Sequence, residues 1–241
     1  MKLFIVEHYD EMTKLTYDII EKVIKNKENP VISMTTGGTP EGLFKMIVNE
    51  ENKGNLDLSN TIMMNLDEYI GPKDAPYSVN RYMNERLYDK LNKQPKEKLL
   101  INGDPDKIEE SIEEYKKLLD QNKRDIQILG LGTNGHIGAN EPGTSFDSSI
   151  FLAHHENSTI ESTIKQYGIK REEAPDKMIT LGFKEILEAE QVILMASGKS
   201  KAEAISKVIK GEISEEVPAS YLKDKENVII IIDQEAASLL F

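Results

Sequence analysis

The stretch "PVISMTTGGTPEGLF", residues 30–44, decides the fold of this chain. A short apolar run suited to a buried strand leads into a turn with two glycines, and a helical pattern follows from Pro40. Proline is favoured at the first position of a helix, and Thr39 before it is a residue type that caps helices. The order of strand, glycine turn and helix is typical of folds in which parallel strands alternate with helices.

The same order recurs along the whole chain. Apolar runs with strand character occur at 3–7, 30–34, 61–66, 126–131, 191–197 and 228–233. Helical patterns lie between them, at 11–25, 40–49, 79–91, 108–119 and 199–209. Because most of the strand runs are apolar throughout, both of their faces are expected to be covered. The pattern predicts an α/β fold with one mostly parallel sheet, helices on both faces, and a single domain over 1–241.

Composition and charge exclude several classes of function. The chain carries 42 acidic against 30 basic residues, a net charge of −12, and so acidic a surface repels nucleic acid. The absence of cysteine excludes disulfides, thiolate metal sites and a cysteine nucleophile. No apolar run approaches the ~18 residues that a membrane span needs. The apolar run at the start of the chain is too short for a signal peptide. We therefore expect a cytoplasmic protein without nucleic-acid or membrane partners.

Two of the turns after strands are suited to hold an anion. Ligands of such sheets bind beyond the carboxyl ends of the strands, where Thr36, Gly37, Gly38 and Thr39 precede a helix. Backbone amides converging at a helix start favour phosphate. The second turn, "SGKSKAEA" at 197–204, puts Lys199 and Lys201 in a first helical turn, where lysine opposes the helix dipole. Each alone also fits an ordinary turn or a solvated lysine pair, but together they favour a phosphorylated ligand.

Two further segments carry acid–base residues. In "NLDEYIG", 65–71, Asp67 and Glu68 follow directly on an apolar run, and a desolvated carboxylate is suited to abstract a proton next to a carbonyl. In "GLGTNGHIGANEPG", 130–143, Glu141 is placed to fix the tautomer of His136 as a general acid or base. The alternatives are a carboxylate that caps a turn and a structural histidine. The adjacent His154 and His155 have no metal-binding spacing, and no Ser-His-Asp arrangement is present.

Taken in order, six motifs resemble the glucosamine-6-phosphate deaminase/isomerase family, which belongs to one superfamily with 6-phosphogluconolactonase. The motifs are "TTGGTPEG", "NLDEYIG", "GLGTNGHIGANEPGTSF", "ITLGFKEIL", "SGKSKAEA" and "VPASYL". The resemblance extends from about Val31 to Asp233. It implies a Rossmann-like, doubly wound sheet, no metal or organic cofactor, and conversion of an aldose 2-amine 6-phosphate to a ketose 6-phosphate with loss of ammonia.

The resemblance also implies roles for individual residues. Asp67 stands at the position of the enolisation base, which moves a proton between C2 and C1 of the opened sugar. His136 stands at the acid–base group that opens the ring, and Glu141 at the carboxylate that supports it. The phosphate-binding positions correspond to the loop Gly37, Gly38 and Thr39 and to Lys201. The turn itself, apart from the resemblance, leads us to expect hydrogen bonds from the hydroxyls of Thr36 and Thr39 to phosphate oxygens.

Three positions depart from the family pattern. Asn134 stands where many members have aspartate; as a neutral amide it can orient His136 but cannot raise its basicity as a charge would. Ala139 stands where phenylalanine is common, which is expected to widen or reshape the pocket. The segment 154–168 lacks the usual phosphate-binding arginine, and Lys165 stands near its position, offering a point charge in place of a bidentate fork.

These departures leave several alternatives open. Glucosamine 6-phosphate is the first expected substrate, and galactosamine 6-phosphate, giving tagatose 6-phosphate, is the second. A 6-phosphogluconolactonase is disfavoured because "NEPG" and "NLDEY" are not its usual motifs. A non-enzymatic sugar-phosphate sensor is disfavoured because it would not need Asp67, His136 and Glu141 together. A homo-oligomer is compatible with the sequence but does not follow from it.

Overall fold

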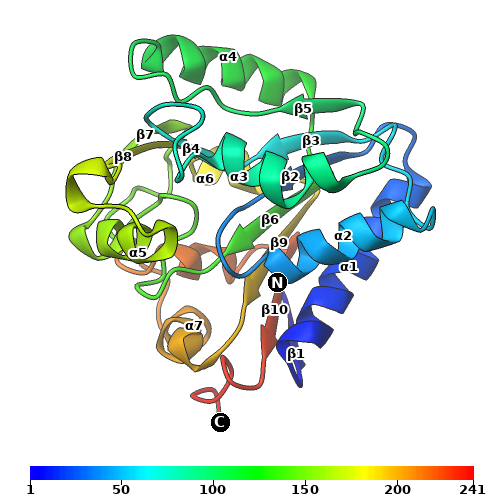
Figure 1. Cartoon of the computed structure of the whole chain (residues 1–241). Coiled ribbons are helices and arrows are strands. Elements are labelled where there is room, and N and C mark those ends of the chain that lie inside the picture. Colours follow the sequence, from blue (N-terminus) through cyan, green and yellow to red (C-terminus); the bar gives the residue numbers. More distant parts are fainter.

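The computed structural model describes residues 1–241, apart from the side chains of Ser158, Ser162 and Gln166. It contains a seven-stranded parallel sheet with helices on both faces, and a three-stranded antiparallel sheet beside it (Figure 1). The mostly parallel, doubly wound α/β fold expected from the sequence is therefore confirmed.

All six strands expected from apolar runs lie in the large sheet. Its order is β1-β10-β9-β6-β2-β3-β5, and every neighbouring pair is parallel. The strands are β1 (Lys2–Val6), β2 (Val31–Met34), β3 (Ile62–Asn65), β5 (Glu97–Leu99), β6 (Ile126–Gly130), β9 (Gln191–Ala196) and β10 (Val228–Asp233). The short edge strand β5 was not expected, because its sequence "EKL" has no apolar run.

The inner strands are mostly apolar on both faces because successive side chains point into two different cores. In β9, Val192 and Leu194 belong to one hydrophobic cluster, and Ile193 and Met195 to the other. The first core lies under α4 (Ile108–Gln121), α6 (Phe183–Leu187) and α7 (Ala202–Lys210). The second lies under α1 (Tyr9–Asn26), α2 (Glu41–Asn52) and α3 (Val79–Arg86).

The small sheet is an addition to the single-layer sheet that the sequence predicted. It pairs β4 (Asp67–Tyr69), β8 (Lys177–Thr180) and β7 (Phe151–His154) in antiparallel order. Only Leu66 separates β4 from β3 of the large sheet. The N–H of Leu66 donates to Met34 O, and its carbonyl accepts from Leu181 N–H, both at 3.0 Å. One residue thus joins the two sheets.

Two expected helices have different bounds in the structure. The helix expected at 79–91 is α3 and ends at Arg86, because the buried Leu87 leaves helical geometry; a 3₁₀ turn follows at Tyr88–Lys90. The helix expected at 199–209 begins as a 3₁₀ turn at Lys199–Lys201 and continues as α7. A further helix, α5 (Asn157–Tyr167), lies beside the small sheet in Figure 1.

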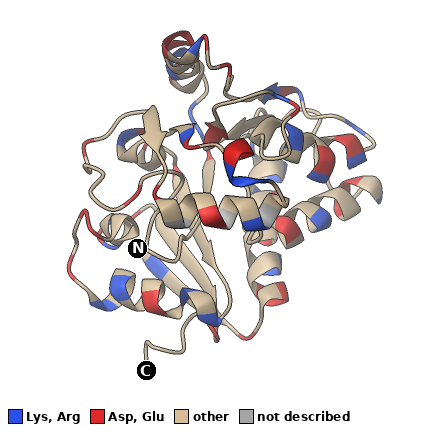
Figure 2. Ribbon diagram, turned by 60° about the vertical axis from the view of Figure 1, so that its left-hand side comes forward, with Lys and Arg blue, Asp and Glu red and all other residues tan. Residues whose placement is uncertain are grey.

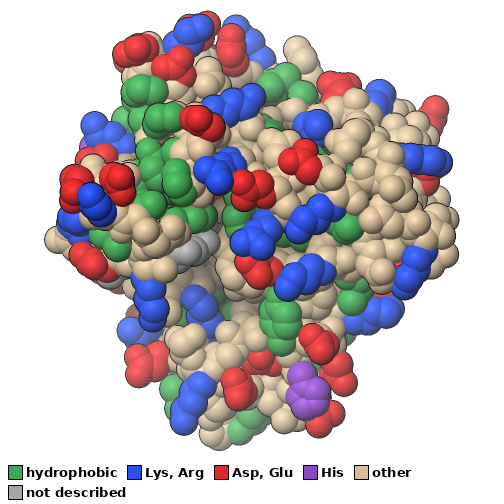
Figure 3. Space-filling model, viewed as in Figure 1, with side chains coloured by type: hydrophobic (Ala, Val, Ile, Leu, Met, Phe, Trp, Pro, Cys, Tyr) green, Lys and Arg blue, Asp and Glu red, His purple; other side chains and the backbone are tan. Residues whose placement is uncertain are grey.

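Charged residues lie mainly on the helices and loops, and the central strands carry few (Figure 2). On the face seen in Figure 3, basic and acidic side chains are interspersed. Within the residues that the structure describes, no helix is long and apolar enough to cross a membrane.

Candidate active site

A cavity of about 300 Å³ opens at the carboxyl ends of the parallel strands. Its walls come from the turns after β2, β6 and β9, from the small sheet, and from α5. In Figure 3 the surface is hollowed beside α5. The polar residues that line it are Thr35, Thr36, Thr39, Asp67, Tyr69, Thr133, Asn134, His136, His155, Thr159, Thr163, Tyr167 and Lys201. A ligand in this cavity would meet side chains from several elements at once.

The loop after β2 has its shape fixed from outside the cavity. Gly37 has φ +98°, a backbone conformation that glycine adopts without steric cost. The Tyr82 hydroxyl donates to Gly37 O at 2.8 Å, and the Tyr9 hydroxyl donates to Thr39 O at 2.8 Å. Thr39 does not cap the helix as expected: α2 begins at Glu41 after Pro40, and no side chain caps it. The two tyrosines instead hold the loop's carbonyls.

Lys201 lines the same cavity and directly precedes α7, which covers the face of the large sheet opposite to α2. It ends the turn after β9 and lines the cavity, whereas Lys199 is exposed. Burial lowers the pKa of Lys201 below its ordinary value. An anion beside its ammonium group would offset that desolvation, as expected for a phosphate site.

Asp67 is the first residue of β4, and its carboxyl group faces the cavity. Its side chain is buried and Oδ1 has no hydrogen-bond partner among the described residues. Burial, and secondarily the charge of Glu68, raises the pKa of Asp67 to about 7. A carboxyl group with such a pKa can both take up and release a proton near neutral pH.

Glu68, the next residue, lies on the other face of β4 and has a full set of partners. Its carboxylate accepts the N–H groups of Val79, Asn80 and Tyr69 at 2.7, 2.8 and 2.9 Å. The Ser78 hydroxyl donates to it at 3.3 Å. Burial raises the pKa of Glu68 to about 7, against these hydrogen bonds, which lower it. Glu68 thereby anchors the start of α3.

The loop after β6 brings His136 and Glu141 together as the sequence predicted. His136 Nδ1 lies 3.3 Å from Glu141 Oε2. Asn134 lies between them: its amide donates to Glu141 Oε2 at 2.8 Å, and its oxygen accepts the His136 backbone N–H at 3.1 Å. Gly132 is required here, because a Cβ at this position would lie 2.4 Å from the His136 ring.

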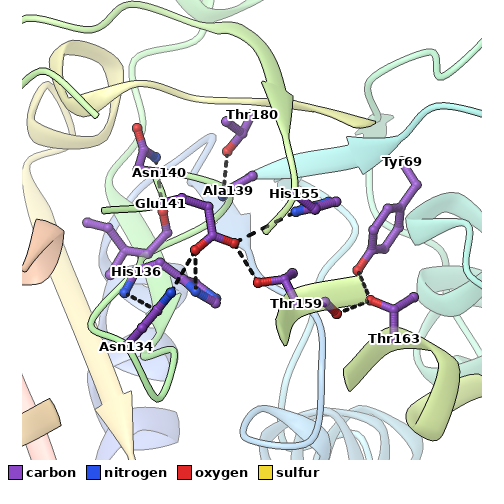
Figure 4. A network of polar contacts seen from close by, with 11 residues as sticks. Tyr69, Asn134, His136, Ala139, Asn140, Glu141, His155, Thr159, Thr163 and Thr180 are labelled. Carbon is purple, nitrogen blue, oxygen red and sulfur yellow. Dashed lines mark hydrogen bonds and ion pairs between the residues drawn. The ribbon is translucent and has the colours of Figure 1, made fainter. Parts of the chain in front are cut away.

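Glu141 lies behind the cavity wall, between two imidazoles (Figure 4). Its Oε1 accepts from the Thr159 hydroxyl at 2.6 Å and lies 3.9 Å from His155 Nδ1. Burial acts to raise the pKa of Glu141, but the contacts with His136, His155 and Thr159 outweigh it and lower the pKa below its ordinary value. Glu141 is therefore an ionised carboxylate that orients the groups around it.

The structure brings most of the predicted site residues to one cavity. The residues that line it as expected are Thr36, Gly37, Gly38, Thr39, Asp67, Asn134, His136 and Lys201. One expectation fails: Lys165 is exposed on α5 and does not line the cavity. Ala139 is buried beside the site and does not itself line the cavity.

Several cavity residues were not singled out from the sequence. Among them are Tyr69, His155, Thr159, Thr163, Tyr167 and Met178. Three of them recur at a spacing of four in α5, which puts them on one face of that helix. This spacing was the available signal. In the described part of the chain, no cluster of three or more His, Cys, Asp or Glu could hold a metal ion.

The fold is α/β, and acid–base groups and a loop suited to bind an anion meet in one cavity at the carboxyl ends of parallel strands. Together these features indicate an enzyme. The chain belongs to the family described as glucosamine-6-phosphate isomerases/6-phosphogluconolactonase, whose model matches residues 6–231.

Several relatives of this chain are named as glucosamine-6-phosphate deaminases. A glucosamine-6-phosphate deaminase from Thermoanaerobacter sp. (strain X514) is 40% identical, over 100% of this chain and 95% of the relative. Glucosamine-6-phosphate deaminase 1 of Bacillus subtilis (strain 168) is 39% identical, over 99% of each chain. The solved structure of a monomeric glucosamine-6-phosphate deaminase matches with TM-score 0.94 and 38% identity, over 99% of this chain and 100% of the other.

A more distant match shows only that the fold is shared. The 6-phosphogluconolactonase from Trypanosoma brucei matches with TM-score 0.78 and 17% identity, over 100% of this chain and 98% of the other. Its activity is therefore not assigned to this chain.

Proposed function

We propose that this protein is an amino-sugar-6-phosphate deaminase that converts glucosamine 6-phosphate to fructose 6-phosphate and ammonia. The observation that carries the proposal is the buried carboxyl group of Asp67, whose Oδ1 has no hydrogen-bond partner among the described residues and which faces the same cavity as His136. Relatives that share about 40% identity over their whole length support the reaction class. No metal or organic cofactor is required by this chemistry.

Ring opening is assigned to His136. The step moves a proton from O1 to the ring oxygen O5, and an imidazole that can give and take a proton is suited to it. Oε2 of Glu141 lies 3.3 Å from Nδ1 of His136, and Nε2 of the ring is assigned to the sugar. Asn134 supports this pair without adding charge.

Enolisation is assigned to Asp67. In the opened sugar its carboxylate takes the proton from C2, and the carboxylic acid returns it to C1 on the same face of the enolamine. The resulting imine at C2 takes up water and releases ammonia, which leaves the ketose. Since Asp67 has a pKa of about 7, both protonation states are available near neutral pH.

Phosphate binding is assigned to the loop 36–39 and to Lys201. These groups hold the end of the substrate that does not react, and such remote binding positions C2 against Asp67. Lys165 is not part of this assignment, because it is exposed outside the cavity.

The first experiment is ammonia release and ketose 6-phosphate formation from glucosamine 6-phosphate and galactosamine 6-phosphate, assayed side by side. We expect the higher kcat/KM with glucosamine 6-phosphate. The reverse preference would assign the galactosamine substrate, and turnover of neither would overturn the proposal.

A lactonase or a sensor is a weaker candidate. Hydrolysis of a lactone needs no base that shuttles a proton between carbons, and a sensor needs neither Asp67 nor His136 as a proton-transfer group. Hydrolysis of 6-phosphogluconolactone by the same preparation, without ammonia release from amino sugars, would favour the lactonase.

A further inference from the structure

The two adjacent histidines, which sequence patterns assigned to no site, have different surroundings at the end of β7. His154 is exposed, whereas the side chain of His155 is 3% exposed and lines the cavity. Successive side chains of a strand point to opposite faces, which explains the difference. The backbone N–H of His155 donates to Asp176 O at 2.9 Å, so strand pairing fixes the start of its side chain.

The ring nitrogens of His155 have no hydrogen-bond partner among the described residues. Nδ1 lies 3.9 Å from Glu141 Oε1, beyond hydrogen-bonding distance, and the Tyr69 ring lies 5.5 Å away, centre to centre. Figure 4 shows His155 between Tyr69 and Glu141. A buried polar group without a partner is costly, and one in a cavity wall indicates a partner supplied by a ligand.

The position of His155 indicates which part of a ligand it meets. Tyr69 pairs with Met178 and Ala153 pairs with Met178, so Asp67, Tyr69, Met178 and His155 share the inner face of the small sheet. Because His155 lines the cavity from the same face as Asp67, the proposed base at C2, we expect it to meet the part of a ligand near the reacting carbons.

We propose that His155 contacts the substrate and hydrogen-bonds a hydroxyl group of the sugar chain, so that it contributes to the choice among hexosamine 6-phosphates. The proposal rests on the proposed function. An imidazole offers one donor and one acceptor in its neutral form. Two sugars that differ in the direction of one hydroxyl therefore match it unequally, and a site built to bond a hydroxyl rejects the mismatched sugar.

The direct test compares His155→Phe with His154→Phe, which makes the same change on the exposed face of the strand. Phenylalanine keeps a planar ring against Tyr69 but removes both ring nitrogens. We expect His155→Phe to lower kcat/KM for glucosamine 6-phosphate by about tenfold or more and to change the preference over galactosamine 6-phosphate. Inhibition by inorganic phosphate is expected to stay unchanged, and His154→Phe to match the wild type.

His155→Gln adds a rescue arm, because its amide keeps a donor and an acceptor. We expect it to retain more of kcat/KM than His155→Phe. If His155→Phe stays within about twofold of the wild type, or weakens phosphate inhibition as much as it lowers kcat/KM, the proposal is overturned. Absence of amino-sugar turnover in the wild type would instead overturn the proposed function.

If His155→Phe does not fold, a measurement on the unaltered protein tests whether His155 contacts the substrate. The chain has only four histidines, so their imidazole signals can be separated by NMR after ¹⁵N-histidine labelling. We expect the His155 signals to shift when an open-chain amino-sugar alcohol 6-phosphate, which cannot enolise, is added. Inorganic phosphate alone is expected to leave them in place. Unchanged His155 signals with the saturating analogue would overturn the contact.

Discussion

The two faces of β4 place adjacent carboxyl groups in opposite circumstances. Asp67 faces a cavity of about 300 Å³ that also contains His136, and its Oδ1 has no partner among the described residues. Glu68 borders a second hollow of about 390 Å³, but four donors already occupy its carboxylate. Both side chains are buried and of the same charge type. The difference lies in the partners, which leave one carboxyl group free to react and use the other to build the fold.

The largest expected effect comes from Asp67→Asn, which keeps the shape of the side chain and removes its basicity. We expect kcat to fall by about 10³-fold or more, with KM changed little and phosphate inhibition intact. Steady-state ammonia release measures this. An Asp67→Asn enzyme with kcat near that of the wild type would remove Asp67 from the mechanism.

Glu68→Gln is expected to have the complementary effect. An amide group turns one donor toward the N–H groups that now bond the carboxylate, so the start of α3 loses charge-assisted hydrogen bonds. We expect the free energy of unfolding to fall by about 2–4 kcal/mol, measured by urea denaturation, while kcat of the folded enzyme falls far less than in Asp67→Asn. Equal losses of kcat in the two variants would contradict the division of roles.

The pH dependence of stability gives a third contrast. In the folded protein Asp67 has a pKa of about 7, against an ordinary value of 3.8. Between these values the folded state retains a proton that the unfolded state has lost, so raising the pH destabilises the fold, by up to about 1.4 kcal/mol per pH unit. Asp67→Asn removes this term. We therefore expect the stability of Asp67→Asn relative to the wild type to rise between about pH 4 and pH 7 and to level off above that range. A constant difference would contradict the raised pKa.

Lys201→Ala extends the comparison to the non-reacting end of the cavity. We expect KM to rise about tenfold and kcat to change less, because the lost contact binds ground state and transition state alike. Lys199→Ala is the matched control, since Lys199 is exposed in the same turn. A larger loss in the control would reassign the phosphate contact to Lys199.

The smallest effect is expected at Lys165. Because this side chain is exposed outside the cavity, Lys165→Ala should leave KM and kcat within about twofold of the wild type. A rise in KM as large as that of Lys201→Ala would show that Lys165 reaches the bound substrate after all.

The large sheet and the residues at its strand ends were predictable from local sequence. Continuous apolar runs such as 228–233 identify strands buried on both faces, and glycine turns place the following polar groups at the carboxyl edge. Asp67, His136 and Lys201 could be singled out on this basis, although their roles came from the family resemblance.

The small sheet and α5 could not be predicted in the same way. Strands of three or four residues such as β4 and β8 are too short for a periodic signal, and their pairing depends on contacts distant in sequence. The surroundings of His155 could therefore not be predicted from the sequence. Lys165 was assigned from its position in the family pattern, because the sequence did not show which face of the helix it occupies. The face of α5 that lines the cavity carries Thr159, Thr163 and Tyr167. Because this face is not an apolar stripe, hydrophobic periodicity does not identify it.

The single residue between β3 and β4 has a consequence for how the length of this chain can vary. Leu66 is bonded to both sheets, so an extra residue beside it cannot be absorbed by a loop. Because side chains alternate along a strand, a shift of one position would turn Glu68 toward the sugar and Asp67 toward α3. An insertion or deletion of one residue within 62–69 of this chain is therefore expected to abolish activity.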